Sequence, residues 1–225
     1  MAVLTITIDG PAASGKSTVA RLLAKKLGAS FLDTGAMYRA VTFAAIQEGV
    51  DLKNEEELLG VFEKNDFRFS AKNDQMAVHI NGIDVTEELR DPKVTAKAHY
   101  IASARRVREK LVQMQRQYAA EQKRIVTEGR DQGTIAFPDA NAKFFLVAQS
   151  RERAKRRLAE LQAKGINESL EKIQELIEKR DKSDSERNVG PLKPAQDAIK
   201  IDTTDLNIEQ VLEKVLVFIP HSNSF

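Results

Sequence analysis

The sequence predicts an α/β fold of three layers, in which helices cover both faces of a parallel central sheet. Three observations predict it. Residues 3–8 form a continuous apolar run rich in β-branched side chains, which is typical of a strand buried on both faces. A glycine-bounded turn follows, and from Ser17 apolar residues recur at helical spacing. Strand-like and helix-like segments then alternate along most of the 225 residues, as in a parallel sheet.

The first helix is expected to run from Ser17 to Leu27, because Gly28 stands where a helix would end. A short strand is expected at residues 29–33, with a second helix from residue 34 to Gly49. The pattern then becomes strand-like from about Phe62 to Asp84. There FRFS and MAVHI are separated by KNDQ, and Asn81-Gly82 gives a tight-turn signal. We interpret this stretch as a small antiparallel insertion.

The rest of the chain returns to alternating strands and helices. One long polar helix is predicted over residues 93–122. The remaining predictions are strands at 125–127 and 142–147, a basic helix after Ser150 that ends at Gly165, a helix whose apolar face is Leu170, Ile173, Leu176 and Ile177, a strand at 198–201, a last helix carrying residues 208–216, and a frayed tail at 220–225.

Composition removes several classes of function. There is no cysteine, so disulfides, thiolate metal sites and cysteine nucleophiles are excluded, and three histidines disfavour a histidine-built metal site. The 35 basic and 33 acidic residues leave a net charge of +2, and tryptophan is absent, which argues against a nucleic-acid partner. Neither a membrane-spanning run nor a secretory signal is visible, so we expect a cytoplasmic protein without a membrane partner.

Residues 10–17, Gly-Pro-Ala-Ala-Ser-Gly-Lys-Ser, match the phosphate-loop pattern G-x-x-x-x-G-K-[ST]. In this pattern the loop amides and the start of the next helix surround phosphate oxygens. Lys16 would reach the β- and γ-phosphates, and the Ser17 hydroxyl would bind Mg²⁺. The match follows a predicted strand and opens a predicted helix, so we expect a nucleoside triphosphate to bind. The Asn-Lys-x-Asp and Asp-x-x-Gly motifs of GTP switches do not occur.

Several arginines fall in loops or near helix ends, where they could gather the phosphates of a donor and an acceptor. Arginine suits this role because it stays charged and binds oxygens with two donors. Arg156 and Arg157 could equally form a solvated helix face, and Asp131 could be an ordinary turn or cap residue. The candidates from the residues alone are Arg39, Arg130, Arg153, Arg156, Arg157, Arg180 and Arg187.

Four segments in this order resemble the bacterial cytidylate kinases: ITIDGPAASGKST, LDTGAMYRAVT, EGRDQGTIAFPDA and KRDKSDSERNVGPLKPA. The resemblance covers about residues 3–219 and implies a P-loop kinase that transfers a phosphoryl group from ATP, with Mg²⁺, to CMP or dCMP. It divides the chain into a core (about 1–60, 100–150 and 190–219), a monophosphate-binding insertion (about 61–99) and a lid (about 151–189). We expect a monomer.

The resemblance also implies roles for single residues. Arg153 and Arg157 would belong to a lid over ATP, with Arg157 on the nucleotide. Lys16, Arg130, Arg153 and Arg187 would act in the transfer itself. Substrate binding would fall to Thr34, Arg39 and Arg130 on the CMP phosphate, His99, Arg108 and Asp131 on the base, Arg180 and Asp184 on the ribose, and Arg187 between the phosphates. The ATP phosphates would be held by Gly10, Pro11, Ala12, Ala13, Ser14, Gly15, Lys16, Ser17 and Thr18.

Two positions depart from the family pattern. His99 stands where a serine usually touches the base, and Gln132 stands where the family usually has an apolar residue. Gln132 could alter the floor of the pocket or face water. Two other functions stay open: a P-loop kinase for another small acceptor, such as UMP, AMP or shikimate, and a non-catalytic regulator that binds a nucleoside triphosphate.

Overall fold

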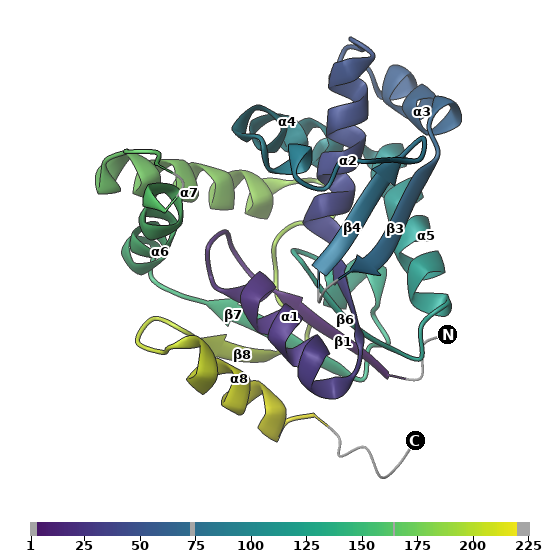
Figure 1. The fold of residues 1–225 in the computed structure, drawn as a ribbon. Helices are drawn as coiled ribbons and strands as arrows, with labels where there is room; N and C mark the ends of the chain where they lie inside the picture. Colours follow the sequence, from purple (N-terminus) through teal and green to yellow (C-terminus); the bar gives the residue numbers. More distant parts are fainter. Residues whose placement is uncertain (1–3, 73–74, 164, 220–225) are drawn as a thin grey trace.

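The computed structural model describes residues 4–72, 75–163 and 165–219. Its centre is a five-stranded sheet in which every neighbouring pair is parallel, with the strand order β2-β6-β1-β7-β8 (Figure 1). The strands are β1 (Leu4–Asp9), β2 (Ser30–Asp33), β6 (Arg124–Gly129), β7 (Ala142–Val147) and β8 (Ile199–Asp202). The predicted three-layer α/β fold is confirmed, although Val3 of the expected first strand lies outside the described residues.

The two faces of β1 differ in chemistry. Leu4, Ile6 and Ile8 are buried in an apolar cluster with α1 (Lys16–Leu27) and α8 (Ile208–Val217). Because side chains alternate along a strand, Thr7 and Asp9 point to the opposite face, where both are also buried. That second face therefore carries polar groups directly beneath the carboxyl ends of the strands. In open parallel sheets, this is the edge where ligands bind.

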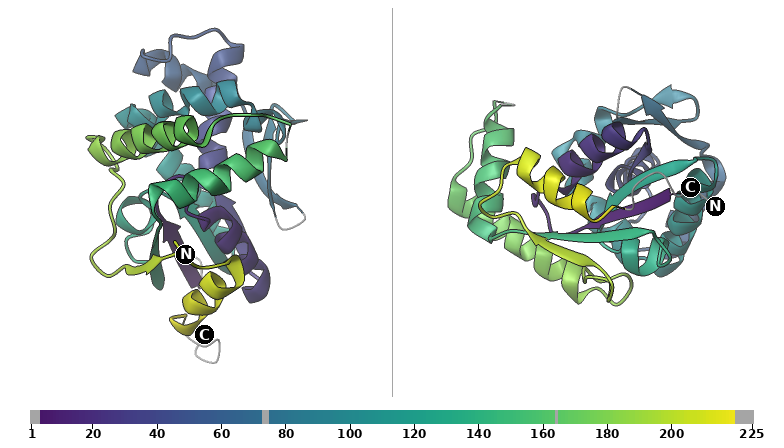
Figure 2. Two further views of the ribbon diagram at one scale, coloured as in Figure 1. Left: turned by 90° about the vertical axis from the view of Figure 1, so that its left-hand side faces the viewer. Right: turned by 90° about the horizontal axis from the view of Figure 1, so that it is seen from below.

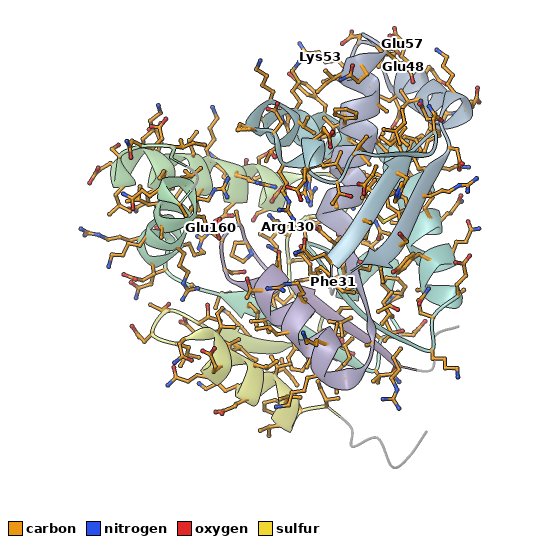
Figure 3. The ribbon with its side chains drawn as sticks, in the orientation of Figure 1. Phe31, Glu48, Lys53, Glu57, Arg130 and Glu160 are labelled. Atoms are coloured by element: carbon orange, nitrogen blue, oxygen red, sulfur yellow. The ribbon has the colours of Figure 1, made fainter. Side chains whose placement is uncertain are left out.

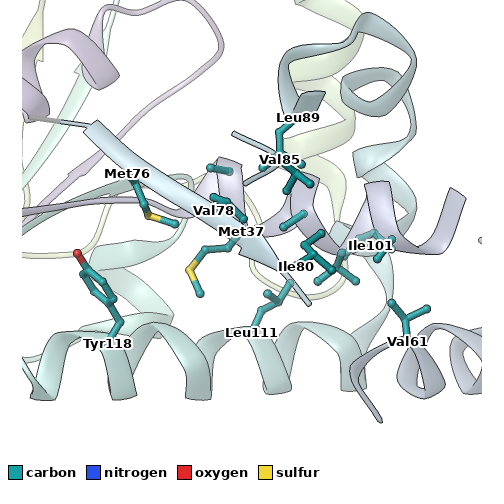
Figure 4. Packing of buried hydrophobic residues seen from close by; sticks show 14 of the residues in the cluster. Met37, Val61, Met76, Val78, Ile80, Val85, Leu89, Ile101, Leu111 and Tyr118 are labelled. Atoms are coloured by element: carbon teal, nitrogen blue, oxygen red, sulfur yellow. The ribbon is translucent and has the colours of Figure 1, made fainter. Parts of the chain in front are cut away.

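A second apolar cluster joins the sheet to the insertion. The insertion has the antiparallel strands β3 (Phe67–Lys72), β4 (Gln75–Ile80) and β5 (Ile83–Asp84). Apolar side chains of β3 and β4 pack on α2 (Thr34–Gln47) and α5 (Arg105–Ala120) (Figure 4). Between β4 and β5, Asn81 and Gly82 have φ of 53° and 80°, as in a type I′ hairpin turn. The predicted antiparallel insertion and its tight turn are thus confirmed. Residues 73 and 74 of KNDQ lie outside the described residues.

The prediction of one long helix over residues 93–122 is wrong. The structure has two helices, α4 (Pro92–Ser103) and α5, separated by Ala104 in an extended conformation (φ −78°, ψ 113°). Neither glycine nor proline marks this break. Tertiary contacts replace the missing helical bond, since the Arg106 amide donates to Glu55 Oε1 at 2.8 Å. The interruption starts a new helix three residues before Arg108.

A further helix, α3 (Glu55–Lys64), falls partly where strand-like structure was expected, so β3 begins at Phe67 rather than near Phe62. Its signal is present in the sequence: Asn54 caps the helix by accepting from the amides of Glu56 and Glu57 at 3.1 and 3.4 Å. The short turn η1 (Glu88–Arg90) precedes α4, and a π-helical turn, η2 (Gln132–Ala136), follows β6.

Helices α6 (Ser150–Gln162) and α7 (Leu170–Glu186) pack side by side and project from the carboxyl edge of the sheet (Figures 1 and 2). The loop between β1 and α1 lies next to them. In the described part of the chain, no helix is both long and apolar enough to cross a membrane.

Candidate active site at the carboxyl edge of the sheet

The loop between β1 and α1 has the backbone that its glycines require. Gly10 and Gly15 have φ of 153° and 88°. A methyl group on Gly10 would overlap the carbonyl oxygen of Leu146 in the neighbouring strand, so no larger residue fits there. Ala13 also has a positive φ, 56°, which is unusual for a residue with a side chain. The predicted phosphate loop is thus positioned between a buried strand and the N-terminus of α1.

Lys16 and Ser17 both face Glu128 at the end of β6. The Ser17 hydroxyl donates to Glu128 Oε1 at 2.8 Å, and Lys16 Nζ lies 3.8 Å from Glu128 Oε2. Burial, together with Arg130, lowers the pKa of Lys16 to about 8, while Glu128 opposes the shift. A hydroxyl beside a carboxylate is a pair of hard oxygen donors, which fits Mg²⁺. Glu128 was not singled out from the sequence.

Asp9 fixes the segment that follows β6. Its two carboxylate oxygens accept from the amides of Gln132 and Gly133 at 2.9 and 2.8 Å. Burial raises the pKa of Asp9 to about 7, and these two amides oppose the rise. The carboxylate therefore anchors the start of η2, which places Arg130 and Asp131 beside the phosphate loop.

Arg108 and Asp131 form a buried ion pair between α5 and this segment, with side chains only 3% and 7% exposed. The Arg108 guanidinium also lies 5.6 Å from the centre of the Tyr38 ring, a cation–π contact. Gly190 packs directly on the pair, and a methyl group there would overlap both side chains. These contacts hold a guanidinium and a carboxylate side by side in a fixed orientation.

A second group of cations surrounds Asp184 on α7. Arg130 Nε donates to Asp184 Oδ2 at 2.8 Å, and Arg187 Nη1 lies 3.9 Å from Asp184 Oδ1. Burial opposes ionisation of Asp184, yet Arg130 and Arg187 keep its pKa below the usual range. Figure 3 shows Arg130 near the centre of the molecule, far from Glu57 on α3. The predicted residues Arg130, Asp184 and Arg187 are thus brought together.

Arg180 faces the same group without a carboxylate of its own. Within the described ranges, no acidic group lies within ion-pair distance of its guanidinium. Part of the side chain is exposed, but crowding by protein atoms and the neighbouring Arg130 lower its pKa to about 10. A guanidinium in this electrostatic setting favours an incoming anion.

Thr34 and Arg39 lie at the start of α2, on the same edge. The Thr34 hydroxyl donates to the backbone oxygen of Glu128 at 2.7 Å. Arg39 Nη2 lies 3.2 Å from Asp33 Oδ2, and Asp33 also caps the helix through the Ala36 amide at 2.8 Å. The Arg39 Nε is buried without a partner in the described structure. Both predicted residues therefore flank the end of β6, opposite the phosphate loop.

Two arginines of the basic helix α6 contact the phosphate loop, and a third arginine does not. Arg153 Nη1 donates to the backbone oxygen of Ala12 at 3.0 Å. Arg156 does not lie on a solvated face: it donates to Thr203 Oγ1 at 3.1 Å and approaches the Ser14 oxygen at 3.5 Å. Arg157 is exposed and forms an ion pair at 2.8 Å with Glu160 of the same helix, not with the loop.

Among the described residues, His99 makes no hydrogen bond or ion pair with Arg108 or Asp131. Its imidazole is exposed, and Nδ1 lies 2.8 Å from the backbone oxygen of Ala96. The other departure, Gln132, does not face water: it is 1% exposed. Its Oε1 accepts from Thr127 Oγ1 at 2.9 Å, and its Nε2 donates to Gln115 Oε1 at 3.3 Å. A polar chain thus ties the segment after β6 to the middle of α5.

The contact between Gln132 and Gln115 gives a testable prediction about stability. Gln132→Met should cost roughly 1–3 kcal/mol, because Gln115 and Thr127 lose partners in a buried site. Gln115→Met should also destabilise the protein. The double variant should be more stable than the sum of the two losses by about 1 kcal/mol or more, since no amide is then left unpaired. Urea unfolding measures this, and strictly additive losses would contradict the contact.

Similarity to known proteins shows the family of this chain. The family model described as "Cytidylate kinase" matches residues 6–221. Curated cytidylate kinases from Bacillus thuringiensis (strain Al Hakam) and Bacillus anthracis (strain A0248) are each 47% identical over 213 residues, which cover 95% of this chain and 94% of the relative. Among solved structures, a shikimate kinase from Bacteroides thetaiotaomicron aligns with a TM-score of 0.47 and 13% identity, covering 95% of this chain and 97% of the other. The fold assignment stands on the strand order, and the chain belongs to the cytidylate kinase family.

Proposed function

We propose that this protein transfers the γ-phosphoryl group of ATP to CMP or dCMP, giving CDP or dCDP. The observation that carries the proposal is the convergence of two sites at one sheet edge. The phosphate loop with Lys16 lies beside Arg130, and the next residue, Asp131, forms the buried pair with Arg108. The first site suits a triphosphate, and the second suits a base with both donor and acceptor atoms.

On the donor side, the loop amides and Lys16 would hold the ATP phosphates, with Thr18 and the other loop residues around them. Ser17 and Glu128 would hold Mg²⁺, which when bound neutralises charge on the β- and γ-phosphates. Arg153 would act from the lid, and Arg157 would approach the nucleotide. Because Arg157 is exposed and paired with Glu160, its role requires that pair to open.

On the acceptor side, Thr34, Arg39 and Arg130 would bind the CMP phosphate, and Arg180 and Asp184 the ribose. The attacking oxygen belongs to a phosphate that is already anionic, so no strong general base is needed. Catalysis then depends on positioning and on cations near the transferring group, which are Lys16, Arg130 and Arg187. Pre-positioned charges act without reorganising during the reaction.

The pair of Arg108 and Asp131 would read the base. A carboxylate accepts from the exocyclic amino group of cytosine, whereas uracil carries a carbonyl at that position, which would repel it. Arg108 would donate to the carbonyl oxygen O2 and the ring nitrogen N3 of cytosine, and His99 would contact the base from α4. A cavity of about 440 Å³ opens between α7 and the end of α4, with Ser103 and Arg187 on its wall.

Residues 61–99 would form the monophosphate-binding insertion and residues 151–189 would form the lid.

The experiment that tests the proposal is the release of ADP with fixed ATP and Mg²⁺ and separate acceptors: CMP, dCMP, UMP, AMP and shikimate. Strong stimulation by CMP and dCMP, weak stimulation by UMP and none by AMP or shikimate is the expected result. Lys16→Ala is the control, and it should lower turnover by about three powers of ten or more while the fold is retained.

An equal rate with UMP would leave the reaction in place and overturn base reading by Asp131. Absence of stimulation by every acceptor would leave only a nucleotide-binding protein, and the kinase proposal would be wrong.

The low pKa of Lys16 predicts that ATP binding depends on pH. In the free protein this ammonium loses its proton as the pH rises through about 8. Because the bound phosphates favour the charged form, ATP binding at pH 9 should take up close to one proton. Titration calorimetry in two buffers of different ionisation enthalpy measures the uptake. Lys16→Arg, whose side chain stays charged, should show none, and a parent protein without uptake would refute the shift.

A further inference from the structure

The phosphate loop is held from outside by two side chains of the helices above it. The amide of Ala12 donates to Asp181 Oδ1 at 3.2 Å, and the Ala12 oxygen accepts from Arg153 Nη1 at 3.0 Å. Arg153 and Asp181 also form an ion pair with each other. Both polar backbone groups of one loop residue are therefore bound, one by α7 and the other by α6. We call this arrangement the Ala12 clamp.

The clamp is largely shielded from solvent and its groups are hydrogen-bonded. The side chains of Arg153 and Asp181 are 7% and 17% exposed, and Arg153 Nε also donates to the Ala148 oxygen at 2.9 Å. An apolar contact supports the polar one, because Ala13 packs against the cluster of Ala154, Ile173 and Ile177. A buried ion pair needs this full set of partners to persist. The α6–α7 pair is thus seated on the loop by polar and apolar contacts together.

The loop needs such support because one of its residues is strained. Ala13, directly after the clamped residue, has a φ of 56° without being glycine. Residues in this region of backbone space persist only where the surrounding structure holds them. By fixing Ala12 at both ends, Asp181 and Arg153 hold the curvature that aims the following amides at phosphate.

The acceptor side of α7 has a contact of its own, at Asp184. Asp181 follows Arg180 directly and precedes Asp184 by three residues, so Asp181 and Asp184 share a helical face. Asp184 in turn accepts from Arg130 at 2.8 Å. The contact between Asp184 and Arg130 therefore holds α7 over the acceptor side without the clamp, and Asp181 holds the same helix on the phosphate loop.

We propose that Asp181 is a positioning residue for the phosphoryl donor, acting through Ala12 and Arg153 without touching the nucleotide. On this view Arg153 also works mainly through the loop backbone. The inference rests on the proposed function for its kinetic consequences, but its effect on ATP binding stands without an acceptor.

The test compares Asp181→Ala with Asp181→Asn, and uses Glu178→Ala as the matched control. Glu178 lies one turn earlier on α7 and accepts from Ser150 of α6 at 2.7 Å, so its loss breaks a contact between the same helices away from the loop. Asp181→Ala should weaken ATP binding and lower kcat by roughly tenfold or more each. The KM for CMP should stay within about twofold, because Asp184 keeps its own hydrogen bond with Arg130 on the acceptor side.

Asp181→Asn keeps an oxygen for the Ala12 amide but loses the ion pair, so it should fall between the parent and Asp181→Ala. Glu178→Ala should bind ATP within about twofold of the parent. Calorimetric titration with ATP and Mg²⁺ measures binding without turnover, and ADP release with CMP measures the kinetics.

The proposal is overturned if Asp181→Ala folds and binds ATP as the parent does, if Glu178→Ala loses as much affinity, or if CMP and ATP are affected equally. A parent protein that binds ATP but does not phosphorylate CMP would contradict the proposed function. The affinity comparison would still decide the clamp.

Discussion

The site depends on one electrostatic constraint: several cations must stay close together before any anionic substrate arrives. The fold meets this constraint by placing a carboxylate beside most of these cations. Lys16 faces Glu128, Arg39 faces Asp33, Arg108 faces Asp131, and Arg130 and Arg187 share Asp184. These pairs are at least partly buried, where an unpaired charge would be strongly destabilising. The carboxylates thus keep the cations ordered, and phosphate groups can compete for the same donors when they bind.

The central sheet supplies the geometry of these pairs. Glu128 is the last residue but one of β6 and Asp33 ends β2, and the register pairs these two positions directly. Asp9 ends β1, opposite Gly129, and reaches across to the amides of η2. Three acidic residues at the carboxyl ends of three adjacent strands therefore organise the site. The same alternation that buries Ile6 and Ile8 on one face of β1 places Thr7 and Asp9 beneath the chemistry on the other.

The sequence could predict the parts of this arrangement that depend on short motifs of neighbouring residues. The phosphate loop, the buried strand before it and the turn at Asn81-Gly82 each have a local signal that the structure confirms. Arg130 and Asp131 could be placed near the loop because they follow a buried strand. Only the family resemblance implied that Arg108 binds the base, because nothing in its own helix distinguishes it from Arg105 or Arg106.

The rest is fixed by contacts between distant segments. The break at Ala104 has no glycine or proline, and it depends on Glu55 from another helix. Arg156 and Arg157 are neighbours with the same chemistry, yet α6 turns only the first toward Thr203 and Ser14. In the sequence, Glu128 and Asp9 look like ordinary acidic residues near strand ends. Their roles appear only in the structure, where Glu128 accepts from Ser17 and Asp9 accepts from the amides of η2. The polar side chain of Gln132 is tolerated in a buried site because it donates to Gln115, which lies 17 residues away in the sequence.

The most direct test of the charge constraint is the stability of Asp184→Asn, measured by urea unfolding with and without inorganic tripolyphosphate at matched ionic strength. Without the polyanion, the variant should be less stable than the parent by roughly 1–3 kcal/mol, because Arg130 and Arg187 lose their shared negative charge. With tripolyphosphate, which has no ribose or base to contact Asp184, the difference should shrink toward zero. An equal loss under both conditions would show that Asp184 does not hold the cations in readiness for phosphate, and the account would be contradicted.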